Sequence, residues 1–285
     1  MPSEPHPCAG VWIEAAPFRE LSLRPLRKAE RLARNAGTVG WVIPESPWIA
    51  DAVDGLGKSA IRIDLRRGTC DAARPADLER VLEVEPDLIG LPVHDLDRLP
   101  RAALLANERL IARAAEDEVD VVLLARGTPT EAGAVAAFAA EHEAVLAISV
   151  DIVDEEALDA LCRDEALCIQ TSGIEFASAF RHGAGAIDRF LGLVSPSAAV
   201  AFLELCAEDV TAALDVERRL QHFVEAHIEP LQRRFGGDDA VLGGILVALG
   251  GWCPALPAPD VAIDPGRLRE ALEAACPELV PFLGP

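Results

Sequence analysis

The sequence predicts an α/β protein: a TIM (β/α)8 barrel of parallel strands followed by a C-terminal helical extension. Short apolar segments typical of buried strands alternate with helical segments about eight times within residues 1–195. A parallel sheet covered by helices satisfies this alternation, and eight such units can close into a barrel. After Pro196 the strand-like segments stop, so we expect residues 196–285 to form a helical extension packed on the barrel.

The predicted strands are short, apolar and rich in β-branched residues. Residues 119–125 form a continuous β-branched and leucine run, which is typical of a strand buried on both faces. Residues 144–151 have the same character and end in polar residues, as expected for a strand that delivers side chains to a site at its C-terminal end. The other predicted strands lie at residues 11–16, 38–43, 60–64, 87–91 and 166–171, and the last strand lies within residues 186–194.

The predicted helices follow from apolar residues spaced three and four apart and from capping signals. The helix at residues 23–36 begins after a Ser22 cap, tolerates Pro25 in its first turn and stops at Gly37. We predict the other barrel helices at residues 48–53, 75–84, 98–116, 130–141, 154–163 and 174–182, and those of the extension at residues 197–207, 209–235, 240–249 and 265–275.

An open doubly wound sheet is the alternative architecture. It is disfavoured because no glycine-rich G-x-G-x-x-G turn follows the first predicted strand. No flexible linker separates the two parts of the chain, so we expect the extension to pack against the barrel.

The formal net charge of −21 argues against nucleic acid and anionic membrane partners. Seven cysteines are scattered without a C-x-x-C pair, which favours reduced thiols in a cytoplasmic protein. The N-terminus lacks a basic-then-apolar signal pattern, and no apolar run reaches membrane-spanning length.

Several segments together resemble the dihydrodipicolinate synthase and N-acetylneuraminate lyase family of class I aldolase barrels. Ala16-Pro17-Phe18 is similar to the family's Thr-Pro-Phe turn after the first strand. Residues 183–187 and 194–196 resemble its eighth strand and the proline that opens the next helix. The family's C-terminal tail is resembled by residues 210–235, Gly243-Gly244, residues 254–259 and Arg267-Leu268. The resemblance implies a barrel with a helical extension and a homo-oligomer, either a dimer or a tetramer.

The family's chemistry does not carry over with this resemblance. Family members form a Schiff base with a 2-oxo acid through a lysine at the end of the sixth strand, and Ser149 stands at that position. Leu124 replaces the family's proton-relay tyrosine, and residues 44–48 replace its Gly-Thr-Thr-Gly-Glu loop. The chain's two lysines, Lys28 and Lys58, are expected outside the barrel and at its N-terminal face. Lysine-dependent aldolase chemistry is therefore rejected.

Polar residues at the predicted strand ends still offer candidates for a site. Arg126 is expected either to clamp a carboxylate or phosphate or to pair with a loop acid. His94 is expected either to act as a base oriented by Asp95 or to be a solvated loop histidine. The catalytic candidates are Ser149, His94 and Asp151, and the ligand-binding candidates are Arg126, Arg189, Glu45, Ser46 and Thr171.

No metal or other cofactor is predicted. Glu14, Glu45, Asp64 and Asp151 could converge on a divalent cation, but no ligand spacing supports it, and pairing of separate acids with arginines is preferred. Two functions stay open. The favoured one is a non-catalytic relative, a pseudoenzyme that binds a small anionic ligand or a partner. The alternative is a lyase-like enzyme with lysine-independent acid–base chemistry on a small oxo-acid-like substrate.

Overall fold

The computed structural model is a closed barrel of eight parallel strands, as the sequence predicts. It describes residues 6–19, 21–65, 74–93, 101–125, 132–150, 155–163, 166–171, 174–235, 239–253 and 263–284. Each strand pairs with the next along the chain, and the last pairs with the first. The strands are β1 (Gly10–Glu14), β2 (Gly40–Pro44), β3 (Ala60–Asp64), β4 (Leu88–Val93), β5 (Asp120–Ala125), β6 (Val145–Val150), β7 (Cys168–Thr171) and β8 (Ala186–Asp188).

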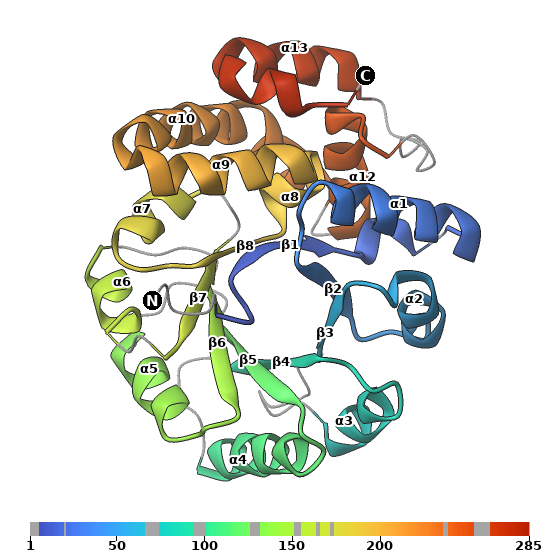
Figure 1. Cartoon of the computed structure of the whole chain (residues 1–285), viewed down its shortest axis with the longest axis vertical. Coiled ribbons are helices and arrows are strands. Elements are labelled where there is room, and N and C mark those ends of the chain that lie inside the picture. The colour runs from blue at the N-terminus through green and yellow to red at the C-terminus, as the bar shows by residue number, and fades with distance from the viewer. Residues whose placement is uncertain are drawn as a thin grey trace.

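A ring of helices surrounds the strands, and the later helices gather on one side of the ring (Figure 1). The helices of the ring are α1 (Leu23–Asn35), α2 (Ile49–Leu56), α3 (Pro75–Leu82), α4 (Arg101–Glu116), α5 (Ala132–Ala140), α6 (Glu155–Leu161), α7 (Phe176–Arg181) and α8 (Phe190–Val194). The later helices are α9 (Pro196–Glu208), α10 (Val210–Phe223), α11 (Glu229–Phe235), α12 (Asp239–Gly250) and α13 (Pro265–Ala275). Three short helical segments, η1 (Ala16–Phe18), η2 (Val224–Ile228) and η3 (Pro277–Phe282), complete the described structure.

Residues 186–194 contain the last strand, as predicted: β8 takes up Ala186–Asp188, and Phe190–Val194 form the helix α8. Arg189 has a φ of 78°, which breaks the extended chain after β8. All five residues of α8 are buried, so their apolar run looked like a continuation of the strand. Ser22 occupies the N-cap position of α1 as predicted, but its side chain makes no capping hydrogen bond.

The strands present alternate residues to the barrel interior and to the surrounding helices. The interior cluster of apolar residues is separate from the outer core and consists of Cys8, Trp12, Val42, Leu88, Val122, Leu124, Ala147, Cys168 and Ala186. On β6 the alternation shifts, because Val121 pairs with Val145 whereas Val122 pairs with Ala147. Leu146 is therefore an extra residue, a β-bulge, on β6.

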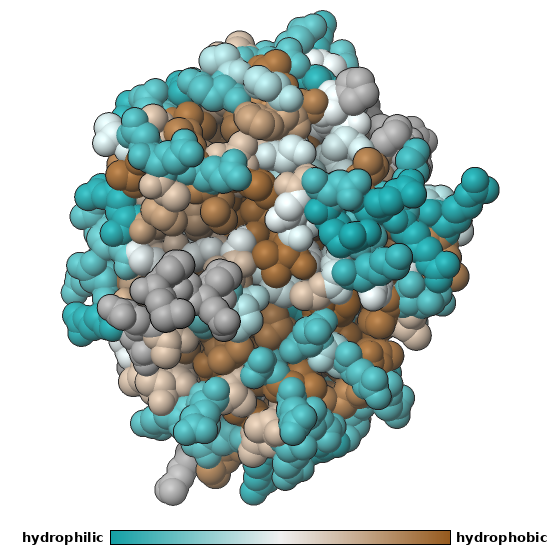
Figure 2. Space-filling view, viewed as in Figure 1, coloured by the Kyte–Doolittle hydropathy of each residue, from teal (hydrophilic) through white to brown (hydrophobic). Residues whose placement is uncertain are grey.

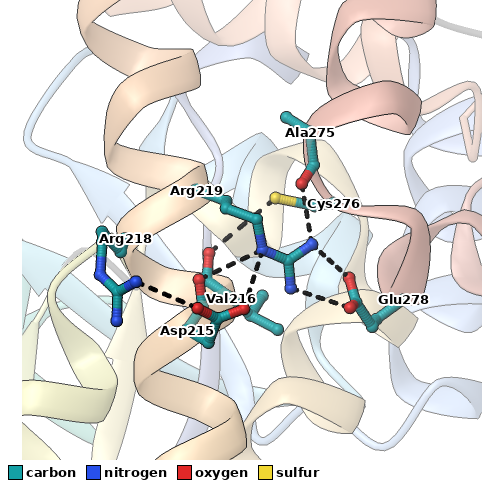
Figure 3. A network of polar contacts seen from close by, with 7 residues as sticks. All are labelled: Asp215, Val216, Arg218, Arg219, Ala275, Cys276 and Glu278. Carbon is teal, nitrogen blue, oxygen red and sulfur yellow. Dashed lines mark hydrogen bonds and ion pairs between the residues drawn. The ribbon is translucent and has the colours of Figure 1, made fainter.

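The helices after residue 195 pack closely on the barrel. Ser195 caps α9, and its hydroxyl donates to the carbonyl of Phe282 at 2.6 Å. The indole of Trp252 donates to Leu193 O at 2.8 Å and packs against Phe18 of η1. A network around Arg219 ties α10 to the end of the chain (Figure 3). The extension is therefore held by polar contacts as well as by apolar burial.

The face in Figure 2 is hydrophilic mainly along its periphery, and apolar residues lie nearer its centre. Glutamate, aspartate and arginine side chains form several exposed ion pairs on the outer helices, such as Arg113–Glu79 and Arg27–Asp54. No helix within the described residues has the length and apolar character needed to cross a membrane.

Candidate functional site

The C-terminal ends of the strands form the mouth at which sites lie in this architecture. Ser149 and Leu124 are paired neighbours on β6 and β5. Both side chains belong to the inward-facing set, and Ser149 is fully buried. At the two inward positions where the family resemblance implies a lysine and a tyrosine, the chain therefore places a small hydroxyl and an apolar side chain, both shielded from solvent.

A charged network that the sequence analysis missed crosses the barrel axis. Arg62, in the middle of β3, is fully buried. Its Nε donates to Asp64 Oδ1 at 2.8 Å and its Nη2 to Asp64 Oδ2 at 3.3 Å. Its Nη1 donates to Oε1 of Gln170, on β7, which lies on the opposite side of the barrel. The sequence of β3 could have revealed this network, because Arg62 and Asp64 lie on one face of the strand and alternate with isoleucines on the other face.

Asp64 occupies the mouth end of β3 because β4 leaves room for it. A Cβ at Gly90 would lie 2.1 Å from Asp64 Oδ1, so the absence of a side chain there admits the carboxylate. The buried guanidinium and carboxylate neutralise each other, as buried charges require. The interior of the barrel at this depth therefore holds a buried ion pair that is hydrogen-bonded across the axis to Gln170.

Glu45 and Ser46 lie in the turn that follows β2. The Glu45 carboxylate is buried and forms an ion pair with Arg80, which comes from α3 outside the barrel. The backbone N–H of Glu45 donates to Asp64 O at 2.9 Å, and Ser46 O accepts from Ile49 N at the start of α2. The structure thus brings this turn beside the end of β3, with the Glu45 carboxylate directed to a helix.

Arg189 lies at the end of β8, where it occupies the N-cap position of α8 in a sparsely populated backbone conformation. Its side chain is half-buried. Thr171 ends β7 and is buried, but the strand alternation places it on the face of Ile169, which packs in the outer core. The structure therefore does not bring Thr171 together with Ser149 inside the barrel. Glu14 shares the inward face of β1 with Trp12.

The remaining candidates, His94, Asp151 and Arg126, lie outside the described residues. The two lysines are placed as expected. Lys28 is exposed on α1, and Lys58 is exposed in the turn before β3, at the N-terminal end of the barrel. Within the described part of the chain, no group of three histidine, cysteine or acidic side chains is arranged to hold a metal ion.

The chemistry open to this arrangement is limited by burial. Ser149 has no lysine beside it on the strands, so an imine cannot form there. The Arg62–Asp64 pair lies near the mouth, but the two opposite charges already neutralise each other. An arginine at the end of β8 can contact an anion that enters the mouth.

No protein-family model matches the sequence, and no curated protein is detectably similar to it. Among solved structures, the 4-hydroxy-tetrahydrodipicolinate synthase of Methylacidiphilum fumariolicum SolV is similar over 97% of this chain and 99% of its own, with a TM-score of 0.70 and 12% identity. The sialic acid aldolase of Ruminococcus gnavus gives a TM-score of 0.69 at 15% identity, covering 97% of this chain and 100% of its own.

A prophage protein of the dihydrodipicolinic acid synthase family from E. coli K12, solved in complex with pyruvate, also has a TM-score of 0.69 at 15% identity. The similarity covers 94% of this chain and 98% of that protein. These likenesses extend over the barrel and the C-terminal helices together. At such low identity they show that the chain shares the fold of this family.

Proposed function

We propose that this chain is a divergent relative of the dihydrodipicolinate synthase and sialic acid aldolase barrels that has lost lysine Schiff-base chemistry and binds a small anionic ligand without turning it over. The observation that carries the proposal is Ser149, fully buried beside Leu124 at the position where the sequence resemblance implies a lysine. The chain holds two lysines in all, and both lie away from the barrel interior.

The anionic ligand is inferred from the arginines at the strand ends. Arg189 follows β8 directly, and Arg126 follows β5 in the sequence. A guanidinium binds a carboxylate or phosphate through two parallel hydrogen bonds. A 2-oxo acid such as pyruvate, which the E. coli protein binds, belongs to this class of ligand.

The alternative is an enzyme that uses acid–base chemistry without a lysine. The buried Arg62–Asp64–Gln170 network favours it, because convergent polar groups inside a barrel are costly unless they are well paired and are often kept for a purpose. In that case His94 and Asp151 are the candidate acid and base, and Ser149 leaves space for the substrate.

Trapping with pyruvate and borohydride tests the loss of Schiff-base chemistry. The Ruminococcus gnavus aldolase and its catalytic-lysine mutant serve as the positive and negative controls. We expect intact mass spectrometry to show no reduced adduct on this chain. An adduct mapped by peptide mass to Lys28 or Lys58 would contradict the proposal.

Thermal denaturation with small carboxylates and phosphates tests the ligand. A ligand that binds only the folded state raises the melting temperature, and the rise grows with the logarithm of ligand concentration once that concentration exceeds Kd. We expect Arg189→Ala to abolish the rise that an anion produces, and Arg113→Ala, which removes an arginine paired on the outer surface, to retain it. Product formation from the same compound would favour the enzyme instead.

A further inference from the structure

A single residue, Arg189, connects the last strand of the barrel to the helix that follows it. β8 ends at Asp188 and α8 begins at Phe190, so the chain must pass from strand to helix within one residue. Arg189 makes this connection with φ 78° and ψ −107°, a combination that residues with a Cβ rarely adopt. We refer to residues 188–190 as the elbow.

The position of α8 is fixed from two sides. On the barrel side, a Cβ at Gly192 would lie 3.0 Å from the carbonyl oxygen of Trp12, so α8 packs directly on β1. On the side of the extension, a Cβ at Gly250 would lie 1.4 Å from the carbonyl oxygen of Val194, so the end of α12 touches the end of α8. All five residues of α8 are buried. The helix is therefore wedged between β1 and α12.

Hydrogen bonds connect this wedged helix to the elbow and to the extension. The carbonyl of Arg189 accepts from Leu193 N at 2.9 Å, which closes the first turn of α8. The carbonyl of Leu193 in turn accepts from Trp252 Nε1 at 2.8 Å, and the indole packs against Phe18. Backbone strain of this kind persists only where the surrounding structure imposes it. Around the elbow, the contacts that impose it come from β1 and from the C-terminal extension.

The unusual φ also determines the direction of the Arg189 side chain. Residues alternate along β8, since Ala186 belongs to the interior cluster and Ile187 to the outer core. An extended residue at position 189 would share the face of Ile187 and point to the helices. Because φ in a parallel strand is about −120°, a φ of 78° rotates the Cα–Cβ bond by roughly half a turn about N–Cα, toward the barrel axis. In α/β-hydrolases a strained strand-to-helix turn presents the nucleophile to the site in a comparable way.

We propose that the strained elbow presents the Arg189 guanidinium to an anion in the mouth of the barrel, and that the extension holds it there through α12 and Trp252. Trp252 is then a positioning residue that acts through α8. The inference rests on the proposed function for the class of ligand, whereas the strain imposed by the extension is independent of any ligand. A guanidinium that is already held in place loses less conformational entropy on binding, which favours affinity.

Thermal denaturation of two elbow variants tests the strain. Arg189→Ala and Arg189→Gly both lose the guanidinium, but only glycine relieves the strained backbone. We expect Arg189→Gly to melt about 2–6 °C above Arg189→Ala. His182, which ends α7 with φ −96°, is the matched control: glycine relieves nothing there, and His182→Gly should melt below His182→Ala. An Arg189→Gly variant no more stable than Arg189→Ala would overturn the proposal.

A double-mutant cycle tests whether the extension imposes the strain. Trp252→Phe keeps a ring against Phe18 but removes the hydrogen bond to Leu193. In the wild type the loss is partly offset by release of strain, whereas Arg189→Gly has no strain left to release. The fall in melting temperature caused by Trp252→Phe should therefore be larger by about 2 °C or more in the Arg189→Gly background. Equal falls would overturn the role of the extension. Should Trp252→Phe fail to fold, the comparison of Arg189→Gly with Arg189→Ala still decides whether the elbow is strained.

The role of the elbow in binding is tested with pyruvate and inorganic phosphate, with the rise in melting temperature as the readout. Trp252→Phe should weaken the binding of the anion that stabilises the wild type by about three- to tenfold. Arg189→Lys keeps the charge without the two parallel hydrogen bonds and should retain part of the binding. Unchanged affinity in Trp252→Phe would contradict the positioning role. A wild type stabilised by neither anion would count against the proposed function and the presentation of Arg189 to a ligand, whereas the two stability comparisons fail only if the strain is absent.

Discussion

The carboxylate of Glu217, on α10, accepts a hydrogen bond of 2.6 Å from the backbone N–H of Ala177, at the start of α7. The N–H of Ser178 and its hydroxyl donate to the same carboxylate. A buried acid from the extension thus satisfies the free N–H groups of a barrel helix, as an N-cap residue would. The extension and the barrel are joined at this point by a buried carboxyl group.

Glu217→Ala should lower the free energy of unfolding by about 1–3 kcal/mol, because the buried N–H of Ala177 and the partly buried N–H of Ser178 lose their acceptor. Urea denaturation monitored by circular dichroism measures the change. Glu225→Ala, at an exposed position in η2 directly after α10, is the control and should shift stability by less than about 0.5 kcal/mol. Equal effects of the two substitutions would contradict the capping role.

The pH dependence of stability should carry the signature of Glu217. Burial raises the pKa of this carboxyl above its ordinary 4.5, against the opposing effect of its hydrogen bonds. The folded state therefore binds the proton more tightly than the unfolded state. The stability of the wild type relative to Glu217→Gln should fall as pH rises from about 4.5 through the raised pKa. Unfolding series at several pH values test this, and a flat difference would count against it.

Arg219 and Glu278 should show the opposite sign. The Arg219 guanidinium lowers the pKa of Glu278 below 4.5 through two hydrogen bonds, of 2.8 and 3.0 Å (Figure 3). This contribution is present above pH 4.5 and is lost as pH falls through the lowered pKa. Since the Glu278 side chain is 48% exposed, a double-mutant cycle with Arg219→Ala and Glu278→Gln should give a coupling of only about 0.5–1 kcal/mol. Raising the salt concentration should reduce it.

Two glycine substitutions should act in opposite directions. A Cβ at Gly250 would lie 1.4 Å from the carbonyl oxygen of Val194, so Gly250→Ala must push α12 away from α8 and should cost about 3 kcal/mol or more. Gly133, in α5, has open space around its Cβ position, and Gly133→Ala should stabilise the protein by about 0.5–1 kcal/mol. Melting temperatures that move in the same direction would contradict the packing of α12.

Ser149→Lys tests how completely the barrel interior is filled. The serine is fully buried, so an ammonium at this position should be desolvated, and the variant should lose several kcal/mol of stability, on the order of 3 or more. Ser149→Ala is the size-matched control and should be far milder. A Ser149→Lys variant as stable as the wild type would indicate an open, hydrated pocket and would favour the enzymatic alternative.

The architecture could be predicted because each barrel unit has a local sequence signal: a short apolar strand segment followed by a helical segment. The apolar run at residues 119–125 is longer than a surface strand needs, and it contains β5. The residues of the site were harder to predict. When both faces of a strand are buried, the sequence does not show which residues point to the barrel axis and which point to the helices. Gln170 and Thr171 illustrate this. Gln170 reaches the barrel axis and Thr171 faces the outer core, but Thr171 was the residue predicted to bind a ligand.

Arg62 was missed for a related reason. Its partners Asp64 and Gln170 come from strands on opposite sides of the barrel, and only closure of the sheet brings Gln170 within reach. The sequence placed β8 only somewhere within residues 186–194, because the buried helix α8 is as apolar as a strand and no proline or glycine separates the two. The positive φ of Arg189 sets the boundary between β8 and α8, and an arginine in the sequence does not indicate a positive φ.

The single extra residue on β6 determines which chemistry this strand can present. Beyond Leu146 the register continues with Ala147, Ile148 and Ser149 opposite Val122, Leu123 and Leu124. With an unbroken ladder the same amino acids would rotate half a turn, so that Ile148 would point to the axis and Ser149 to the helices. An insertion or deletion near the base of this strand can therefore exchange the group displayed at its tip without any substitution there, a route by which such barrels can gain or lose a reactive side chain in one step.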